Sequence, residues 1–82
     1  MKVFIATFHT HADAIVSSRA LTTAGIAAKM MPVPRKLSSS CGTCVRYEAE
    51  DANEDKLTDF EAVYSAEEGN KYTLELKEKE PQ

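Results

Sequence analysis

The sequence predicts an α+β domain of the ferredoxin-like type, a two-layer sandwich with the element order β-α-β-β-α-β. Two helices would cover one face of a four-stranded antiparallel sheet. Four short segments have the apolar runs or alternation of strands, two segments have the apolar period of helices, and turn-forming residues separate them. The 82 residues suffice for one small domain, which we assign to residues 1–77, followed by a disordered tail over residues 78–82.

The first half of the chain predicts a strand, a helix and a second strand. Residues 2–8 are apolar almost without interruption, which is typical of a strand in the middle of a sheet. Apolar residues then recur with the helical period from Thr10 or His11 onward, and Gly25 can adopt the left-handed conformation that often ends a helix. Residues 26–31 predict a second strand, which ends because the following prolines cannot donate hydrogen bonds in a sheet.

The second half predicts a third strand, a second helix and a fourth strand. Residues 43–48 alternate between two faces, as a strand does. The segment after them has apolar residues at helical spacing, with acids on the opposite face. These apolar residues are Leu57, Phe60 and Tyr64. Residues 71–77 alternate more clearly than any other segment and predict the fourth strand.

Residues 60–68 allow a second interpretation. A short apolar run fits a strand as well as a helix, because the period alone does not separate the two. Residues 60–64 would then form a strand, and a hairpin through residues 67–70 would join this strand to the one at 71–77.

Charge is divided unevenly along the chain. Residues 1–47 carry six lysines and arginines against one aspartate, whereas residues 48–82 carry twelve acids against four lysines. A basic first half fits an anionic ligand or an acidic partner and argues against nucleic-acid binding, although the acids are equally well explained as a solvated surface. No segment has the length of a membrane span or a secretion signal, so we expect a cytoplasmic protein that binds no membrane.

Residues 32–42 predict a shaped loop, because prolines, serines and a glycine disfavour both helix and strand. Cys41 lies at the end of this loop, and Arg35 and Lys36 precede it by a few residues. Nearby cations favour the thiolate, which is the nucleophilic form of cysteine. We therefore predict that Cys41 carries the chemistry of this protein.

The predicted topology brings a second stretch of sequence to this loop. The first two strands run in the same direction, so the residues that follow them meet at one end of the sheet. His9 and His11 would then lie beside the loop, where a protonated histidine favours a thiolate. Together with Cys41 and Cys44 they include the ligand types of zinc, but they lack the paired spacing of structural zinc sites. We predict no metal and no cofactor.

Cys41 and Cys44 have the C-x-x-C spacing that thiol–disulfide oxidoreductases use. A disulfide requires the two Cα atoms to lie within about 7 Å of each other. Three residues along a strand span about 10 Å, and a strand is predicted from Thr43, so we expect no relaxed disulfide. Redox exchange with Cys44 as a possible second thiol is an alternative function.

The segment from Pro32, with its Pro-x-Pro-Arg stretch and its serine run ending Ser-Ser-Cys-Gly, resembles a family of small bacterial selenium/sulfur (Se/S) carrier-like proteins. The opening Thr7-Phe8-His9 is similar to that family as well, and the resemblance extends over about residues 3–76. The chain departs from the family in its acidic second-helix region and at Cys44, where a small or aliphatic residue is usual.

The resemblance implies a carrier rather than a stand-alone enzyme, in which Cys41 holds sulfur or selenium as a persulfide or perselenide. Its partners would be a donor protein and an acceptor protein. Such an anion needs cations and hydrogen-bond donors, and the candidates are Arg35, Ser39, Ser40, Gly42 and His9. A third interpretation is a module that binds an anion or a partner segment without covalent chemistry. The sequence leaves the oligomeric state open.

Overall fold

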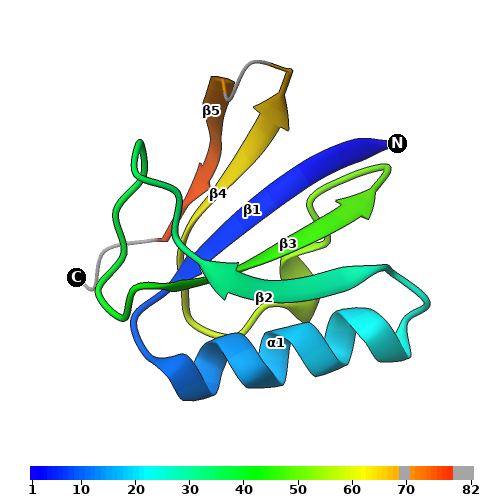
Figure 1. Cartoon of the computed structure of the whole chain (residues 1–82). Helices are drawn as coiled ribbons and strands as arrows, with labels where there is room; N and C mark the ends of the chain where they lie inside the picture. The colour runs from blue at the N-terminus through cyan, green and yellow to red at the C-terminus, as the bar shows by residue number, and fades with distance from the viewer. Residues whose placement is uncertain (69–70, 79–82) are drawn as a thin grey trace.

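The computed structural model describes residues 1–68 and 71–78 as five strands, one α-helix and one short 3₁₀ helix (Figure 1). The elements are β1 (Lys2–Phe8), α1 (His11–Thr23), β2 (Ala28–Pro32), β3 (Thr43–Ala49), η1 (Glu54–Lys56), β4 (Phe60–Glu67) and β5 (Lys71–Lys77). The strands form one antiparallel sheet in the order β2-β3-β1-β4-β5. The first strand of the chain therefore lies in the middle of the sheet, as its almost continuous apolar sequence predicts.

One face of the sheet carries α1 (Figure 1). Thr10 caps the helix by accepting a hydrogen bond from the backbone N–H of Asp13 at 3.1 Å. Gly25, with a φ of 85°, ends it, and the N–H of Ile26 donates to the carbonyl of Leu21 in the pattern of a Schellman motif. The core under the helix consists of Phe4, Ala6, Phe8, Ala14, Leu21, Val45, Tyr47, Ala49, Leu57 and Val63.

The opposite face of the sheet lies against the loop over residues 33–42. A backbone hydrogen bond from Val33 to Gly42 closes the base of this loop, and Pro34 lines a hollow over the outward face of β1. From there the loop extends towards β4 and β5 before it returns to β3 (Figure 1). The outward side chains of Ile5 and Thr7 are consequently buried, although no helix covers them.

The predicted second helix is wrong, and so is the four-stranded ferredoxin-like arrangement with two helices that depended on it. The described chain has a single α-helix, and η1 is only three residues long. Phe60–Glu67 is a strand that pairs with β1 on one side and β5 on the other, which is the alternative that the sequence left open. The reason is two-sided burial: Ala62 and Val63 are adjacent and both buried, which suits a strand between two covered faces.

The predicted tail begins at Glu78, whose backbone N–H donates to the carbonyl of Glu61 at 3.0 Å. The rest of that tail, residues 79–82, and residues 69–70 of the hairpin lie outside the described residues. Within the part of the chain that is described, no helix has the length and hydropathy needed to cross a membrane.

Candidate functional site

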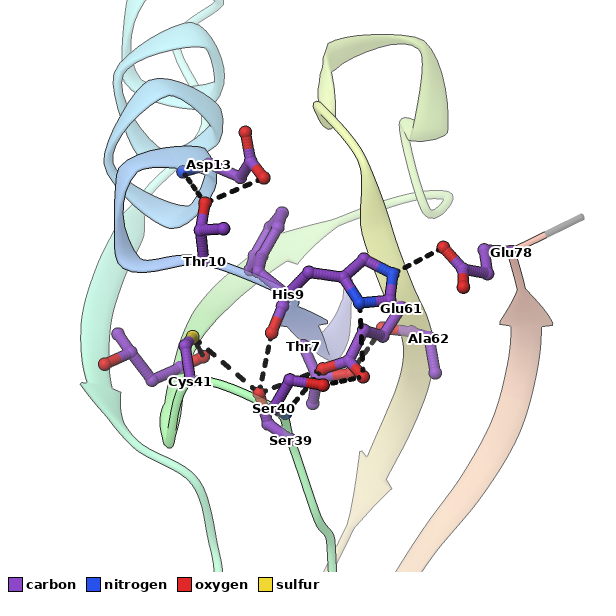
Figure 2. A network of polar contacts seen from close by, with 12 residues as sticks. Thr7, His9, Thr10, Asp13, Ser39, Ser40, Cys41, Glu61, Ala62 and Glu78 are labelled. Atoms are coloured by element: carbon purple, nitrogen blue, oxygen red, sulfur yellow. Dashed lines mark hydrogen bonds and ion pairs between the residues drawn. The ribbon is translucent and has the colours of Figure 1, made fainter. Parts of the chain in front are cut away.

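Cys41 lies at the end of the loop, immediately before β3, and its side chain is half-buried against the core. Its thiol is free. The Sγ atom lies 3.8 Å from Ser39 Oγ and 3.5 Å from the backbone oxygen of Thr43 (Figure 2). Gly42 follows with a φ of 73°, a left-handed conformation that glycine adopts without strain. The turn at Gly42 thus fixes where the chain leaves Cys41 and enters the sheet.

Glu61 of β4 holds the end of the loop in place. One carboxylate oxygen accepts hydrogen bonds from the Ser40 N–H at 2.9 Å and from Ser39 Oγ at 3.1 Å, and the other accepts from Ser40 Oγ at 2.8 Å (Figure 2). We call the interactions of Ser39 and Ser40 with Glu61 the Glu61 clasp. Hydrogen bonds to a carboxylate are stronger than those between neutral groups. The clasp therefore ties a loop of irregular backbone to the central part of the sheet.

A β-bulge aims Glu61 at the loop. Thr7 of β1 lies opposite Ala62, but Phe8 lies opposite Phe60, so Glu61 is an extra residue without a partner on β1. Such bulges commonly redirect a side chain at the edge of a functional site. In a regular strand Phe60 and Ala62, two positions apart, would face the same side of the sheet. The bulge at Glu61 breaks this alternation, so Phe60 packs against the core while Ala62 lies opposite Thr7 on the loop side.

Ser39 connects the clasp to the thiol. Its hydroxyl oxygen lies 2.9 Å from the carbonyl oxygen of Phe8, 3.1 Å from Glu61 and 3.8 Å from Cys41 Sγ. A hydroxyl group has one proton and two acceptor positions. Because the two oxygen neighbours are acceptors, the Ser39 proton is directed to them. The Cys41 thiol donates to the carbonyl oxygen of Thr43 at 3.5 Å, and the Ser39 oxygen is a second acceptor within its reach. A small rotation of the hydroxyl reverses that contact and presents the proton to sulfur.

His9 extends the network to the last strand. Its Nε2 atom lies 2.6 Å from a carboxylate oxygen of Glu78, and its Nδ1 atom lies 3.6 Å from Glu61 (Figure 2). The hydrogen bond to Glu78 raises the pKa of His9 above 6.5, against a partial loss of solvation that lowers it. The network thus runs without a break from Cys41 through Ser39, Glu61 and His9 to Glu78.

The pKa of Glu61 is held below its ordinary value of 4.5. Burial on its own would raise it, but the hydrogen bonds from Ser40 and Ser39 outweigh this effect. Because its pKa is below 4.5, Glu61 is ionised at neutral pH.

These two shifts predict how stability depends on pH. The lowered pKa of Glu61 stabilises the fold above pH 4.5, and this contribution is lost as the pH falls through the folded-state value. The raised pKa of His9 stabilises the fold below pH 6.5, and this contribution is lost as the pH rises through the folded-state value. Urea unfolding across this range should show the greatest contribution of the network between the two values.

The His9→Gln variant is the control for that profile. It should lose the decline on the alkaline side and keep the decline on the acidic side. The alkaline effect should be small, because the side chain of His9 is 40% exposed and solvent screens its ion pairs. An unchanged alkaline decline in His9→Gln would contradict the assignment to this histidine.

The two stretches of sequence that were predicted to meet do lie together. Besides His9, the ring of His11 contacts the loop side, with Nδ1 at 3.3 Å from the hydroxyl of Thr43. His9 faces the two glutamates, however, while His11 faces Thr43, so the rings do not converge. In residues 1–68 and 71–78, no group of three or more histidine, cysteine, aspartate and glutamate side chains is arranged to hold a metal ion.

Cys44 occupies a different environment from Cys41. It is fully buried in β3 between Thr7 and Met31, and its thiol donates to the carbonyl of Pro32 at 3.7 Å. Burial, together with the proximity of Cys41, raises the pKa of Cys44 to about 11. At neutral pH this side chain is a packed, protonated thiol, and nothing in its contacts prepares it for exchange.

Of the two predicted cations, Lys36 lies away from the thiol. Arg35 is exposed in the turn that the hydrogen bond from Leu37 to Pro34 closes. Lys36 lines a hollow beside Lys71 at the hairpin end of β4 and β5, whereas Cys41 is near the opposite end of β4. The charged group nearest to Cys41 along the network is instead the carboxylate of Glu61, one serine away.

Sequence reasoning missed Glu61 and Glu78. Both belong to the acidic second half of the chain, where twelve acids look alike. A weak signal was available at Glu61, because it is a charged residue within an otherwise apolar run from Phe60 to Tyr64. Nothing local distinguishes Glu78, whose role depends on the pairing of β5 with β4.

Comparison with known proteins gives one finding. A family model described as "Putative Se/S carrier protein-like" matches residues 3–65. The match runs from β1 into β4 and includes Cys41 and Glu61, whereas β5 and Glu78 follow it. No curated protein and no solved structure matches the chain.

Proposed function

Because the chain belongs to the Se/S carrier protein-like family, we propose that Cys41 accepts a sulfur or selenium atom as a persulfide or perselenide and passes it to a partner protein. The observation that carries this proposal is the position of Cys41 Sγ: a free, half-buried thiol beside the Ser39 hydroxyl, on a loop that Glu61 holds to the sheet. A thiol that served packing alone would not need that framework.

The transfer is an exchange between two cysteines. The Cys41 thiolate attacks the terminal sulfur of a cysteine persulfide on the donor, the donor's sulfur–sulfur bond breaks, and its cysteine leaves as a thiolate. The proton released by Cys41 ends on that leaving thiolate, so one thiol and one persulfide give one persulfide and one thiol. No external oxidant or reductant is consumed. Delivery to the acceptor repeats the exchange with the roles reversed, and selenium follows the same balance.

Ser39 is suited to assist both stages. In the resting protein its oxygen is positioned to accept the Cys41 proton, and after rotation its hydroxyl can donate to the anionic outer atom of the persulfide. The Ser40 N–H and hydroxyl are already committed to Glu61, so their role is to hold the loop rather than to bind the cargo. His9 positions Glu61 from the other side.

Intact mass spectrometry after incubation with a cysteine desulfurase and cysteine tests this proposal. Wild type and Cys44→Ser should each gain one sulfur atom, and Cys41→Ser should gain none. Treatment of the loaded protein with a thiol reductant should remove the added atom, because a persulfide is reducible.

Two results would contradict the proposal. One is a gain of sulfur that survives in Cys41→Ser, which would place the acceptor elsewhere. The other is no gain in wild type together with loss of two hydrogens in mild oxidant that requires both cysteines, which would indicate disulfide exchange instead.

A further inference from the structure

A groove beside the network has no role in sulfur transfer as described so far. It has a volume of about 550 Å³ and lies between η1 and β5. Its apolar surface comes from Leu57, Phe60 and Leu76, of which Phe60 and Leu76 are only half-buried. We call it the Leu76 groove.

The groove exists because, within residues 1–68 and 71–78, no second α-helix covers β4 and β5. α1 packs on β1, β2 and β3. The β4–β5 half of the same face meets η1, and the segment that follows η1 is tied to α1 by a hydrogen bond from the Thr58 N–H to Ser17 Oγ at 2.8 Å. One turn of 3₁₀ helix is too short to cover two strands, so apolar side chains that belong to the core remain accessible.

The rim of the Leu76 groove is acidic. Glu54, Asp59 and Glu78 line it, with Lys77 as the cation among the lining residues. A second hollow on the other side of η1 shares Glu54 and Leu76 with the groove and adds further acids. The further acids are Glu50, Asp51, Asp55 and Glu75, and Lys2 is the cation that lines this hollow. An apolar floor surrounded by mostly negative charges complements an apolar segment that carries lysine or arginine.

We propose that the Leu76 groove docks a segment of the sulfur-exchanging partner protein, with apolar side chains on the floor and lysine or arginine at the rim. That the partner exchanges sulfur rests on the function proposed above; that the groove binds such a segment rests on its shape and charge. An amphipathic helix suits it, because such a helix presents apolar residues along one side with cations beside them.

The position of Glu78 connects docking with Cys41. The same carboxylate that lines the groove holds His9, which contacts the Glu61 clasp. A partner cation that pairs with Glu78 competes with His9 for it. Docking would therefore change the contacts of His9 in the network that positions Cys41. The groove would also bring the partner's cysteine to the end of the sheet where Cys41 lies.

A model peptide of leucine and lysine in helical repeat, titrated into ¹⁵N-labelled protein, tests the proposal. Amide signals of Leu57, Phe60 and Leu76 should shift, and the ring signals of His9 should follow. A matched peptide of leucine and glutamate should leave all of them in place. Binding of the basic peptide should weaken as salt is added, because exposed charges are screened.

The double variant Glu54→Gln, Asp59→Asn removes two rim charges without changing the floor, and asparagine tolerates the φ of 47° at position 59. It should bind the basic peptide about 5- to 10-fold more weakly, as expected for the loss of two exposed charge pairs. Glu48→Gln, an exposed acid on β3, is the control and should bind like wild type.

The outcomes separate the two proposals. Docking of a basic segment would be overturned by any of three results: signal shifts elsewhere on the sheet, equal binding of both peptides, or groove signals that depend on protein concentration alone. The third result would indicate that a second copy of this chain occupies the groove. Groove binding without sulfur on Cys41 would leave the docking surface standing and overturn the carrier function. Sulfur on Cys41 without groove binding would support the carrier function and overturn the docking surface.

Discussion

Glu61→Ala should release the end of the loop and destabilise the protein by about 2–3 kcal/mol, because the variant removes the acceptor of three hydrogen bonds from Ser39 and Ser40. The side chain of Glu61 is only 23% exposed, so water replaces those bonds incompletely. Urea unfolding measures the loss. Hydrogen exchange of the Ser40 amide should accelerate as well, since its N–H loses its carboxylate partner.

Two further variants sharpen this prediction. Glu67→Ala removes an exposed acid from the far end of the same strand and should change stability by no more than about 0.5 kcal/mol. Glu61→Gln keeps the shape and an acceptor oxygen but removes the charge, and it should fall between wild type and Glu61→Ala. A Glu61→Gln variant as stable as wild type would show that charge contributes nothing to the clasp.

The same Glu61→Ala variant should slow the loading of Cys41 with sulfur while leaving its final extent unchanged with excess donor. The thiol itself is intact, but the loop that positions it next to Ser39 is no longer tied to β4. Alkylation of Cys41 by iodoacetamide should become faster, because a half-buried side chain on a released loop gains exposure. Slower alkylation would contradict this view of the loop.

Phe8→Ala should have the larger effect on stability, a loss of about 3–5 kcal/mol, because it leaves a cavity where a fully buried ring packs. A domain of this size has a total stability of about 4–12 kcal/mol. Thermal unfolding should therefore show a fall in Tm of more than about 12 °C. In the variant the backbone carbonyl of residue 8 can still accept the hydrogen bond from the Ser39 hydroxyl, so the folded fraction should retain the contact between Ser39 and Cys41.

Val16→Ala is the matched control for Phe8→Ala. Val16 lies on the solvent side of α1 and is 51% exposed, so its truncation removes little buried surface. Its Tm should stay close to that of wild type. If the two variants lowered Tm by the same amount, the end of β1 could not be the packed core that supports the site.

Cys41 could be singled out from the sequence as a candidate residue because its signal is local. Prolines and serines define a loop, and a cysteine at its end stands out against a chain with only one other. The cations that were expected to serve it share the same loop, yet the loop carries Lys36 to the opposite end of β4. Closeness in sequence does not predict closeness in space here, because an extended loop separates residues that are only a few positions apart.

The sequence by itself determined β1, α1 and β5, since each depends on a local rule. β1 is an almost continuous apolar run, α1 has its cap at Thr10 and its glycine at Gly25, and β5 alternates through Lys71–Lys77. Only the tertiary structure decided the state of Phe60–Glu67 and the role of Glu61. Apolar residues at 60, 63 and 64 suit either a helix or a strand, and the choice depends on the free edge of β1, more than fifty positions earlier in the chain. The bulge that aims Glu61 at the loop is a property of that pairing, so no local pattern contains it.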